Sequence, residues 1–292
     1  MATNSSVVTT SAPAAEPVVM LLGASALLGT LGVFATEAGQ APLITVWARC
    51  LFGGLALGAY AIARGQTAVL RLGGTTLRLA LLSGVLLVTS WTLFFTSLKH
   101  TSIAVSTVAF HVQPLWVLGV AALRRERVTK WHLGAALLAL VGVGLLSGLT
   151  ADAAEGSLLG VGLALAASLA YAAVTTIAKV IRTTSLGIAW WQCMVGVAIL
   201  SWWPAVHGLP PVGPSWGWLA GLGVIHTGLV YVMTFSAVQR LPMGRVAMLQ
   251  FAYPLFAVLT DSLVYGHALS VGQLLGGAIL ITAQLMPKEN RP

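Results

Sequence analysis

Charged residues are scarce in this chain. Asp, Glu, Lys and Arg make up 8% of the 292 residues, and 58% are hydrophobic, whereas soluble domains carry roughly 25% charged residues. The mean hydropathy is +0.91. A soluble core could not bury so much apolar surface, so the composition excludes a soluble domain and predicts an integral membrane protein.

Cysteine and enzyme motifs are also scarce. The two cysteines, Cys50 and Cys193, both fall inside apolar runs, which argues against a disulfide and a metal cluster. The chain has no His-Glu-x-x-His helix and no phosphate-binding loop with Gly-Lys-Ser/Thr. We therefore expect no metal, no cofactor and no nucleotide-driven pump. An intramembrane enzyme, the remaining catalytic hypothesis, would show turnover without translocation.

Acidic residues are the rarest charged class. There are seven, and only Asp261 falls in an expected span, near its outer end. Because intramembrane proton relays commonly use Asp or Glu, this favours downhill transport, with proton coupling through histidine as the alternative. The net charge of +8 does not indicate nucleic-acid binding, because the Lys and Arg residues lie in short loops between apolar runs.

Long apolar runs are what the chain has in abundance. A membrane-spanning helix needs about 20 apolar residues, and no run alternates as a barrel strand does. We predict ten transmembrane helices, at residues 17–36, 42–63, 77–98, 101–123, 130–149, 157–178, 185–206, 215–237, 243–264 and 270–287.

The two halves of the chain repeat one another. Residues 98–146 correspond to 238–285, so that Pro114 matches Pro254 and Gly134 matches Gly276. Five helices per half would place the halves in opposite orientations. The predicted fold is therefore an all-α membrane protein of ten transmembrane helices in two inverted five-helix repeats. We expect a disordered cytoplasmic tail (1–15), the first repeat (16–149) and the second repeat (150–292).

The basic residues predict the orientation in the membrane. With the N-terminus inside, the outer loops hold only Lys99, and Arg49 lies within a helix. Inner loops are rich in Lys and Arg in membrane proteins, so both termini are expected in the cytoplasm of a bacterial inner-membrane protein. The inner-loop residues are Arg64, Arg71, Arg78, Arg124, Arg125, Arg127, Lys130, Lys179, Arg182, Arg240, Arg245, Lys288 and Arg291.

Several short matches together resemble a known family. They are Arg49 in the second helix, the Leu98–Ser102 turn, Pro114, the Glu126–Thr129 turn before Leu133-Gly134, Pro254 and Leu275-Gly276. In this order the chain resembles the EamA-type members of the drug/metabolite transporter superfamily, over nearly its whole length after the tail. It is most similar to the YddG-type bacterial exporters of aromatic amino acids. One departure is Gly266-His267, where the family often has Gly-Glu.

A transporter of this plan would bind substrate near mid-membrane, between the repeats. The candidates are polar or aromatic residues in the middle of the spans: Trp91, Phe110, His111, Gln113, Tyr171, His226, Tyr231, Gln250 and Tyr253. Their aromatic rings would suit an aromatic or amphipathic ligand. Ordinary packing is the alternative for the aromatic residues, and a neutral hydrogen-bonded side chain is the alternative for the histidines.

Five further residues have predicted structural roles. Pro114 and Pro254 are read as paired hinges beside the cavity, or as packing kinks alone. Arg49 is read as a clamp that bonds neighbouring groups, with contact to a substrate carboxylate as the alternative. Gly134 and Gly276 are expected to serve helix packing.

The sequence thus predicts an alternating-access carrier and not an enzyme. It would export aromatic and other amino acids, with the small-molecule substrate and the lipid bilayer as its partners, as a monomer or weak homo-oligomer. The alternatives are a proton-coupled drug or metabolite exporter and a non-transporting membrane scaffold or sensor.

Overall fold

The described part of the chain is helical throughout. The computed structural model describes residues 15–148 and 157–286, so the expected tail lies outside it except for Ala15. Eight helical stretches in these ranges are long and apolar enough to cross a membrane, which makes this a multi-pass membrane protein. They span Ala15–Ala38, Pro42–Ala63, Gly74–Ser97, Ile103–Leu123, Leu158–Val180, Ser185–His207, Ser215–Arg240 and Met243–Tyr265.

Several of these stretches consist of consecutive helices. The uninterrupted ones are α3 (Pro42–Ala63), α4 (Gly74–Ser97) and α8 (Leu158–Val180), and a short 3-10 turn, η1 (Thr67–Leu70), precedes α4. The others are α1 (Ala15–Gly29) and α2 (Leu31–Ala38), α5 (Ile103–Phe110) and α6 (Gln113–Leu123), α9 (Ser185–Leu200) and α10 (Trp202–His207), α11 (Ser215–Gly221), the π-helix η3 (Leu222–Leu229) and α12 (Val230–Arg240), and α13 (Met243–Gln250) and α14 (Ala252–Tyr265).

Two further apolar helices are shorter than predicted. These are α7 (Lys130–Leu146) and α15 (Val271–Leu285), of 17 and 15 residues. At about 1.5 Å per residue they measure roughly 22–26 Å, less than the roughly 30 Å of a bilayer core. α7 ends at Leu146, with Ser147 as its C-cap and Gly148 in a left-handed conformation (φ 69°), and α15 begins after Ser270, which forms a capping box with Gln273.

The two short helices lie against each other through glycines. A Cβ placed on Gly142 would lie 2.9 Å from the carbonyl oxygen of Gly276, and one on Gly276 would lie 2.7 Å from that of Gly142. The backbones of α7 and α15 therefore touch, as is common between membrane helices. Gly134 does not share this role: a Cβ there would meet no atom within 4 Å, because it lies two helical turns away from the contact.

Both mid-span prolines begin a new helix. Pro114 is the second residue of α6 and Pro254 the third of α14, positions at which proline is well tolerated. Neither residue has the N–H that would bond to the carbonyl four residues earlier, which belongs to Phe110 in one case and Gln250 in the other. The spans are therefore broken at these points rather than gently bent.

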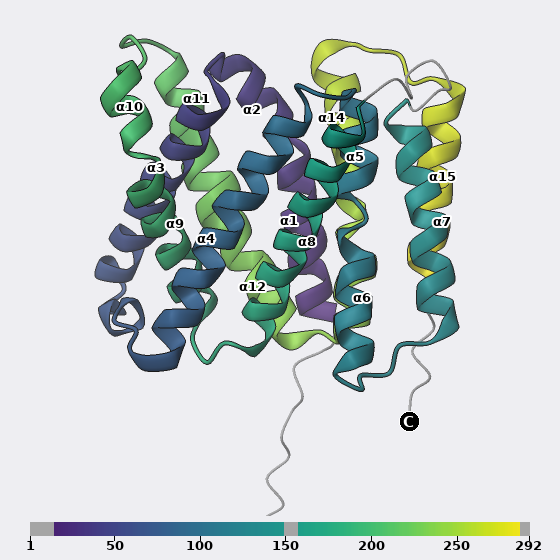
Figure 1. Ribbon diagram of the computed structural model, residues 1–292, viewed down its shortest axis with the longest axis horizontal. Coiled ribbons are helices and arrows are strands. Elements are labelled where there is room, and N and C mark those ends of the chain that lie inside the picture. Colours follow the sequence, from purple (N-terminus) through teal and green to yellow (C-terminus); the bar gives the residue numbers. More distant parts are fainter. Residues whose placement is uncertain (1–14, 149–156, 287–292) are drawn as a thin grey trace, which may run out of the picture.

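The loops divide the bundle into two ends (Figure 1). The connections α3–α4, α6–α7, α8–α9 and α12–α13 lie at its lower edge, where α1 also begins and α15 ends. We call this the basic end, because the described basic residues of the predicted inner loops lie in or beside these connections. Lys99 follows α4 at the opposite edge, which we call the vestibule end. Lys288 and Arg291 lie outside the described residues.

The helix pairings have a regular pattern. α4 packs on α8, and α12 packs on α1; likewise α3 packs on η3, and α9 packs on α4. α7 pairs with α15, α3 with α9, and α6 with α13. The helical spans of each half can be numbered in chain order, with α7 and α15 as the fifth of each. If each first-half span is exchanged for the second-half span with the same number, these pairings map onto one another.

Candidate functional site

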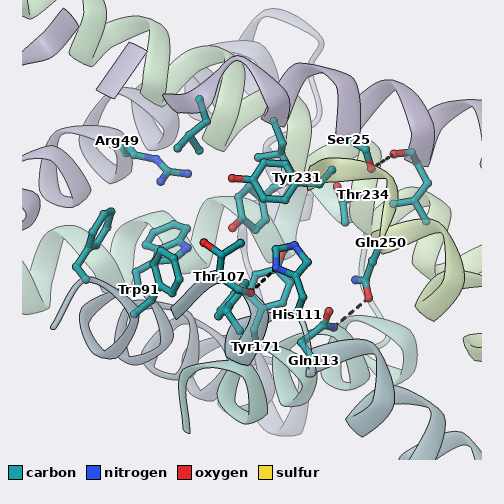
Figure 2. A pocket seen from close by; sticks show the side chains of 17 residues that line it. Ser25, Arg49, Trp91, Thr107, His111, Gln113, Tyr171, Tyr231, Thr234 and Gln250 are labelled. Carbon is teal, nitrogen blue, oxygen red and sulfur yellow. Dashed lines mark hydrogen bonds between the residues drawn. The ribbon is translucent and has the colours of Figure 1, made fainter. Parts of the chain in front are cut away.

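A cavity of about 190 Å³ lies in the middle of the bundle (Figure 2). Its wall comes from α1, α2, α3, α4, α5, α8, α12, α13 and α14, together with His111 between α5 and α6 and Gln113 at the start of α6. Eight of the predicted substrate-binding residues line it: Trp91, Phe110, His111, Gln113, Tyr171, Tyr231, Gln250 and Tyr253. These eight residues, which are up to 162 positions apart in the sequence (Trp91 to Tyr253), are thereby brought around one space.

Aromatic rings form much of the cavity wall. The ring centroids of Trp91 and Tyr231 are 6.0 Å apart, in an edge-to-face arrangement. Phe110 lies 5.0 Å from Phe94 and 5.9 Å from Tyr171. Such contacts hold the rings in fixed orientations and leave apolar faces for a ligand.

Two amide side chains meet across the two halves of the chain. Gln113 Nε2 donates a hydrogen bond of 3.0 Å to Gln250 Oε1 and a longer one of 3.5 Å to Thr175 Oγ1. Both glutamines lie at helix breaks, which place their side chains in the middle of the bundle. The pair is a polar patch in a mainly aromatic wall.

His111 lies between the cavity and a second space. It follows α5, its Nδ1 lies 2.7 Å from the carbonyl oxygen of Thr107, and its ring stacks on Tyr253 at 5.9 Å. Thr107, His111 and Tyr253 also line a second cavity of about 360 Å³, which we call the vestibule. The vestibule extends to Tyr265 at the end of α14 and to Gln273 in the first turn of α15, both at the vestibule end.

The vestibule contains the acid that the sequence placed near the outer end of a span. Asp261 lines it, and its Oδ2 lies 2.8 Å from His267 Nδ1. His267 is the residue that departs from the family's Gly-Glu pattern. Both side chains are more than half exposed, with relative accessibilities of 52% and 69%, so this pair lies at the mouth and not at the cavity.

At the basic end, the turn between α12 and α13 is tied to two other segments. Lys179 Nζ, in the last turn of α8, donates to the carbonyl oxygens of Leu241 (2.6 Å) and Gln239 (3.3 Å). Glu126 Oε2, after α6, accepts from the backbone N–H of Met243 at 3.1 Å. These contacts satisfy groups that helix ends leave unpaired. We call the three bonds the basic-end latch.

Arg49 also lines the cavity. Its side chain is 4% exposed, its Nε donates to Thr227 Oγ1 at 3.1 Å, and its Cζ lies 4.5 Å from the ring centroid of Trp91. The bond to Thr227 is of the kind expected for a structural clamp. Its position on the cavity wall keeps the alternative, a contact with substrate, open.

His226 is the predicted site residue that does not join the others. It belongs to η3, its Nε2 lies 2.8 Å from Thr30 Oγ1, and its ring contacts Phe34 at 4.7 Å. It is absent from the residues that line the cavity. The π-helical turn directs it toward the junction of α1 and α2 instead.

Some cavity residues were not found from the sequence. Ser25 and two leucines come from α1, a third leucine is the first residue of α2, and Thr234 comes from α12. Ser25 was the one available signal in α1, as a polar residue near the middle of an apolar run. The leucines carry no signal, because an apolar side chain facing a cavity looks like one facing lipid. They are Leu21, Leu28 and Leu31.

One short hydrolase-like pattern occurs at the vestibule end. Gly213-Pro214-Ser215-Trp216-Gly217 matches Gly-x-Ser-x-Gly, but Ser215 simply begins α11 after a loop. The hydrolase motif requires a strand that leads into a turn and a helix. No strand precedes this serine in the described chain.

Known proteins resemble this chain over nearly all of it. It is 26% identical over 281 residues to the "Uncharacterized transporter YxxF" of Bacillus subtilis (strain 168), covering 94% of this chain and 90% of that protein. It is 28% identical over 262 residues to an "Uncharacterized transporter" of Archaeoglobus fulgidus, covering 89% and 92%. A crystal structure of a protein 20% identical superimposes with a TM-score of 0.83 over 93% of this chain and 96% of that one.

The family assignment follows from two matched segments. The EamA-like transporter family matches residues 16–148 and again residues 158–286. Proteins of this family are transporters rather than enzymes, and the two relatives are named as transporters. The chain is a member of the EamA-like transporter family, within the drug/metabolite transporter superfamily.

Proposed function

We propose that this protein is an alternating-access carrier that exports amino acids, aromatic ones above all, and other small amphipathic metabolites. The observation that carries the proposal is the central cavity, whose wall combines Trp91 and His111 from the first half with Tyr231, Gln250 and Tyr253 from the second. Carriers built from two repeats bind substrate at the interface between them. A site formed by both halves can be opened to either side when the halves move relative to one another.

The two ends of the bundle support alternating access. At one end the vestibule adjoins the cavity, and at the other the latch joins α8, α12, α13 and the α6–α7 connection. The interchangeable helix pairings support two inverted five-helix repeats. Pro114 and Pro254, at helix breaks beside the cavity, are the proposed hinges.

The cavity supports a small substrate. Its volume of about 190 Å³ is below the roughly 300–1,000 Å³ of pockets for drug-sized ligands. Its rings offer aromatic faces, and its amides and hydroxyls offer hydrogen bonds. Among the described residues that line it there is no carboxylate, which a cationic drug would need as a partner.

The charges support an orientation. Placing the basic end in the cytoplasm satisfies the preference of inner loops for Lys and Arg, and puts the vestibule outside. In the proposed bacterial inner membrane both termini are then cytoplasmic. Because one chain supplies the whole described cavity, we propose a monomer or weak homo-oligomer as the working unit.

The scarcity of acids supports downhill export. In the part of the chain that the structure describes, no Asp or Glu lines the cavity, and intramembrane carboxylates are the usual proton relays. Proton coupling is the second candidate, and His111 is the group that would mediate it, because it lies between cavity and vestibule.

Efflux from proteoliposomes loaded with labelled phenylalanine tests the proposal. Wild-type efflux should exceed that of protein-free liposomes. Thr234→Trp, which fills the cavity, should abolish the excess, whereas Thr282→Trp, on the exposed face of α15, should not. If efflux of phenylalanine and of a panel of other amino acids is no faster than from protein-free liposomes, amino-acid export is refuted.

Two further measurements separate the alternatives. Collapse of the pH gradient should leave the efflux rate unchanged, and an obligatory dependence on the gradient would favour the proton-coupled exporter. A substrate should also raise the melting temperature of the protein, because it binds the folded state. A scaffold or sensor without a transport site would show no stabilisation across the amino-acid panel.

A further inference from the structure

Arg49 is a buried positive charge that has no carboxylate partner among the described residues. It is 4% exposed and lies in a predominantly apolar cavity wall. The ion pairs among the described residues join Arg124 to Glu126, Arg240 to Glu16, and His267 to Asp261, and all three lie at the ends of the bundle. A buried charge is costly unless it is paired, so the absence of a described protein partner points to another source of negative charge.

The π-helix η3 holds this arginine in place. Thr227 Oγ1 accepts from Arg49 Nε at 3.1 Å and donates to the carbonyl oxygen of Leu222, five residues earlier, at 3.1 Å. π-helical turns occur frequently at functional sites. A Cβ on Gly223 would lie 2.8 Å from the backbone nitrogen of Gly53, so α3 and η3 touch directly. The arginine backbone and its Nε are therefore both fixed.

The ring of Trp91 fixes the orientation of the Arg49 guanidinium. The Arg49 Cζ lies 4.5 Å from the Trp91 ring centroid, a distance at which a guanidinium is attracted to the aromatic face. Figure 2 shows the guanidinium pointing into the cavity beside Trp91. The hydrogen bond to Thr227 uses Nε, and within the described chain the terminal nitrogens have no acceptor. That edge of the guanidinium is free for a ligand.

We propose that Arg49 is the carboxylate-binding group of the cavity, and that its substrates are small organic acids with an apolar or aromatic body, amino acids included. A carboxylate would accept two parallel hydrogen bonds from the guanidinium fork and neutralise its charge. The aromatic rings beyond Trp91 would contact the rest of the molecule. Thr227 is a positioning residue. The inference rests on the proposed function, since it takes this cavity as the transport site.

The repeat-related residue supports this assignment. Gln192 precedes Cys193 in α9 as Arg49 precedes Cys50 in α3, so the two residues correspond in the repeat, and Gln192 Nε2 donates to Ser83 Oγ at 2.6 Å. It does not line the cavity. The neutral residue thus bonds another helix of the protein, while the charged one presents its terminal nitrogens to the cavity. A purely structural arginine would use those nitrogens on protein carbonyls.

Three related compounds test the inference in the purified full-length protein. Phenylalanine has both charged groups, 3-phenylpropionate lacks the ammonium group, and phenethylamine lacks the carboxylate. Binding is measured in detergent by the rise in melting temperature and by calorimetry, and transport in proteoliposomes. Wild-type protein should bind the two carboxylates at least about 10-fold more tightly than phenethylamine, the lower end expected for a charge-assisted pair.

Variants of Arg49 and Thr227 then test whether the preference for carboxylates arises from Arg49. Arg49→Gln should weaken carboxylate binding by about 10- to 100-fold and remove the preference. Arg49→Lys keeps the positive charge but not the forked guanidinium, so it should weaken carboxylate binding less than Arg49→Gln does. Thr227→Val should weaken carboxylate binding, and Thr227→Ser, which retains the hydroxyl, should restore it. If Arg49→Gln does not fold, the inference is tested by comparing carboxylate binding to Thr227→Val with that to Thr227→Ser. Equal binding by the two variants would overturn it.

The outcomes separate the inference from the proposed function. Equal binding of phenethylamine and phenylalanine, or an unchanged carboxylate preference in folded Arg49→Gln, overturns the inference while phenylalanine export can persist. Arg49-dependent binding of 3-phenylpropionate without transport of any amino acid supports the inference and refutes amino-acid export.

Discussion

The basic-end latch is expected to control which side of the cavity is open. Lys179 Nζ donates to two carbonyl oxygens at the end of α12, those of Leu241 and Gln239. These carbonyls have no helical N–H to bond them. Lys179→Met keeps the length and apolar character of the side chain but removes its donors, and should favour the state in which the basic end is open.

The size of the shift caused by Lys179→Met can be worked out from the type of hydrogen bond that is lost. A hydrogen bond from a charged group is worth about 1.5–3 kcal/mol, and the second, at 3.3 Å, adds little. Because Lys179 is half-buried, solvent screening reduces the net contribution to about 1–2 kcal/mol. The equilibrium between closed and open basic ends should therefore shift by about 5- to 30-fold.

A buried cysteine measures this shift. Val246 is 0% exposed, in the first turns of α13 next to the latch. In a background with Cys50 and Cys193 replaced by alanine, Val246→Cys should react with a hydrophilic maleimide about 5- to 30-fold faster when Lys179→Met is added. The matched control is Lys99→Met at the vestibule end, which should leave the rate unchanged. An unchanged rate in folded Lys179→Met, or an equal rise in Lys99→Met, would refute the reasoning.

Three further predictions concern the packing of the bundle. Gly142→Ala should lower the unfolding temperature, because its Cβ would press on the Gly276 carbonyl, whereas Gly134→Ala, in open space, should not, since alanine favours a helix by about 0.5–1 kcal/mol. Gln250→Leu removes the acceptor of Gln113 in the cavity and should cost about 1–3 kcal/mol, measured by denaturant unfolding. Ser270→Ala should cost α15 about 1 kcal/mol, seen as faster amide exchange in its first turn, and Ser270→Asp should restore protection.

Much of the fold follows from local properties of the sequence. Apolar runs of about 20 residues can only be helices in a bilayer, because each backbone group must find a partner within its own segment. The helix breaks at Pro114 and Pro254 were also visible, since proline cannot continue the hydrogen-bond ladder. The distribution of Lys and Arg then separated the loops into two groups, and the described loops of each group lie at one end.

The residues of the candidate site could be predicted where side chains carry their own signal. Mid-span aromatic and polar residues such as Trp91, His111 and Tyr253 are unusual in apolar helices, and the structure gathers them around one cavity. His226 has the same signal but lies against Thr30 and Phe34. A polar residue in a span indicates burial, but only the rotation and packing of the helix decide what it faces.

Two features depended on the tertiary structure alone. The π-helix η3 shifts Thr227 into line with Arg49 Nε, and no pattern in Leu222–Leu229 announces it. The sequence likewise left the roles of the glycines undecided. A Cβ on Gly276 would lie against Gly142, whereas one on Gly134 would meet no atom within 4 Å. Contacts between segments distant in the sequence decide such details.

The sequence by itself determined that this is a helical membrane protein with two similar halves, one basic face and broken spans at Pro114 and Pro254. These properties are local, because they depend on the composition and spacing of neighbouring residues. The tertiary structure decided which polar side chains share a cavity, which end of that cavity is latched, and that the guanidinium of Arg49 points into it. These properties arise from the relative rotation of helices that are far apart in the chain, which no local pattern records.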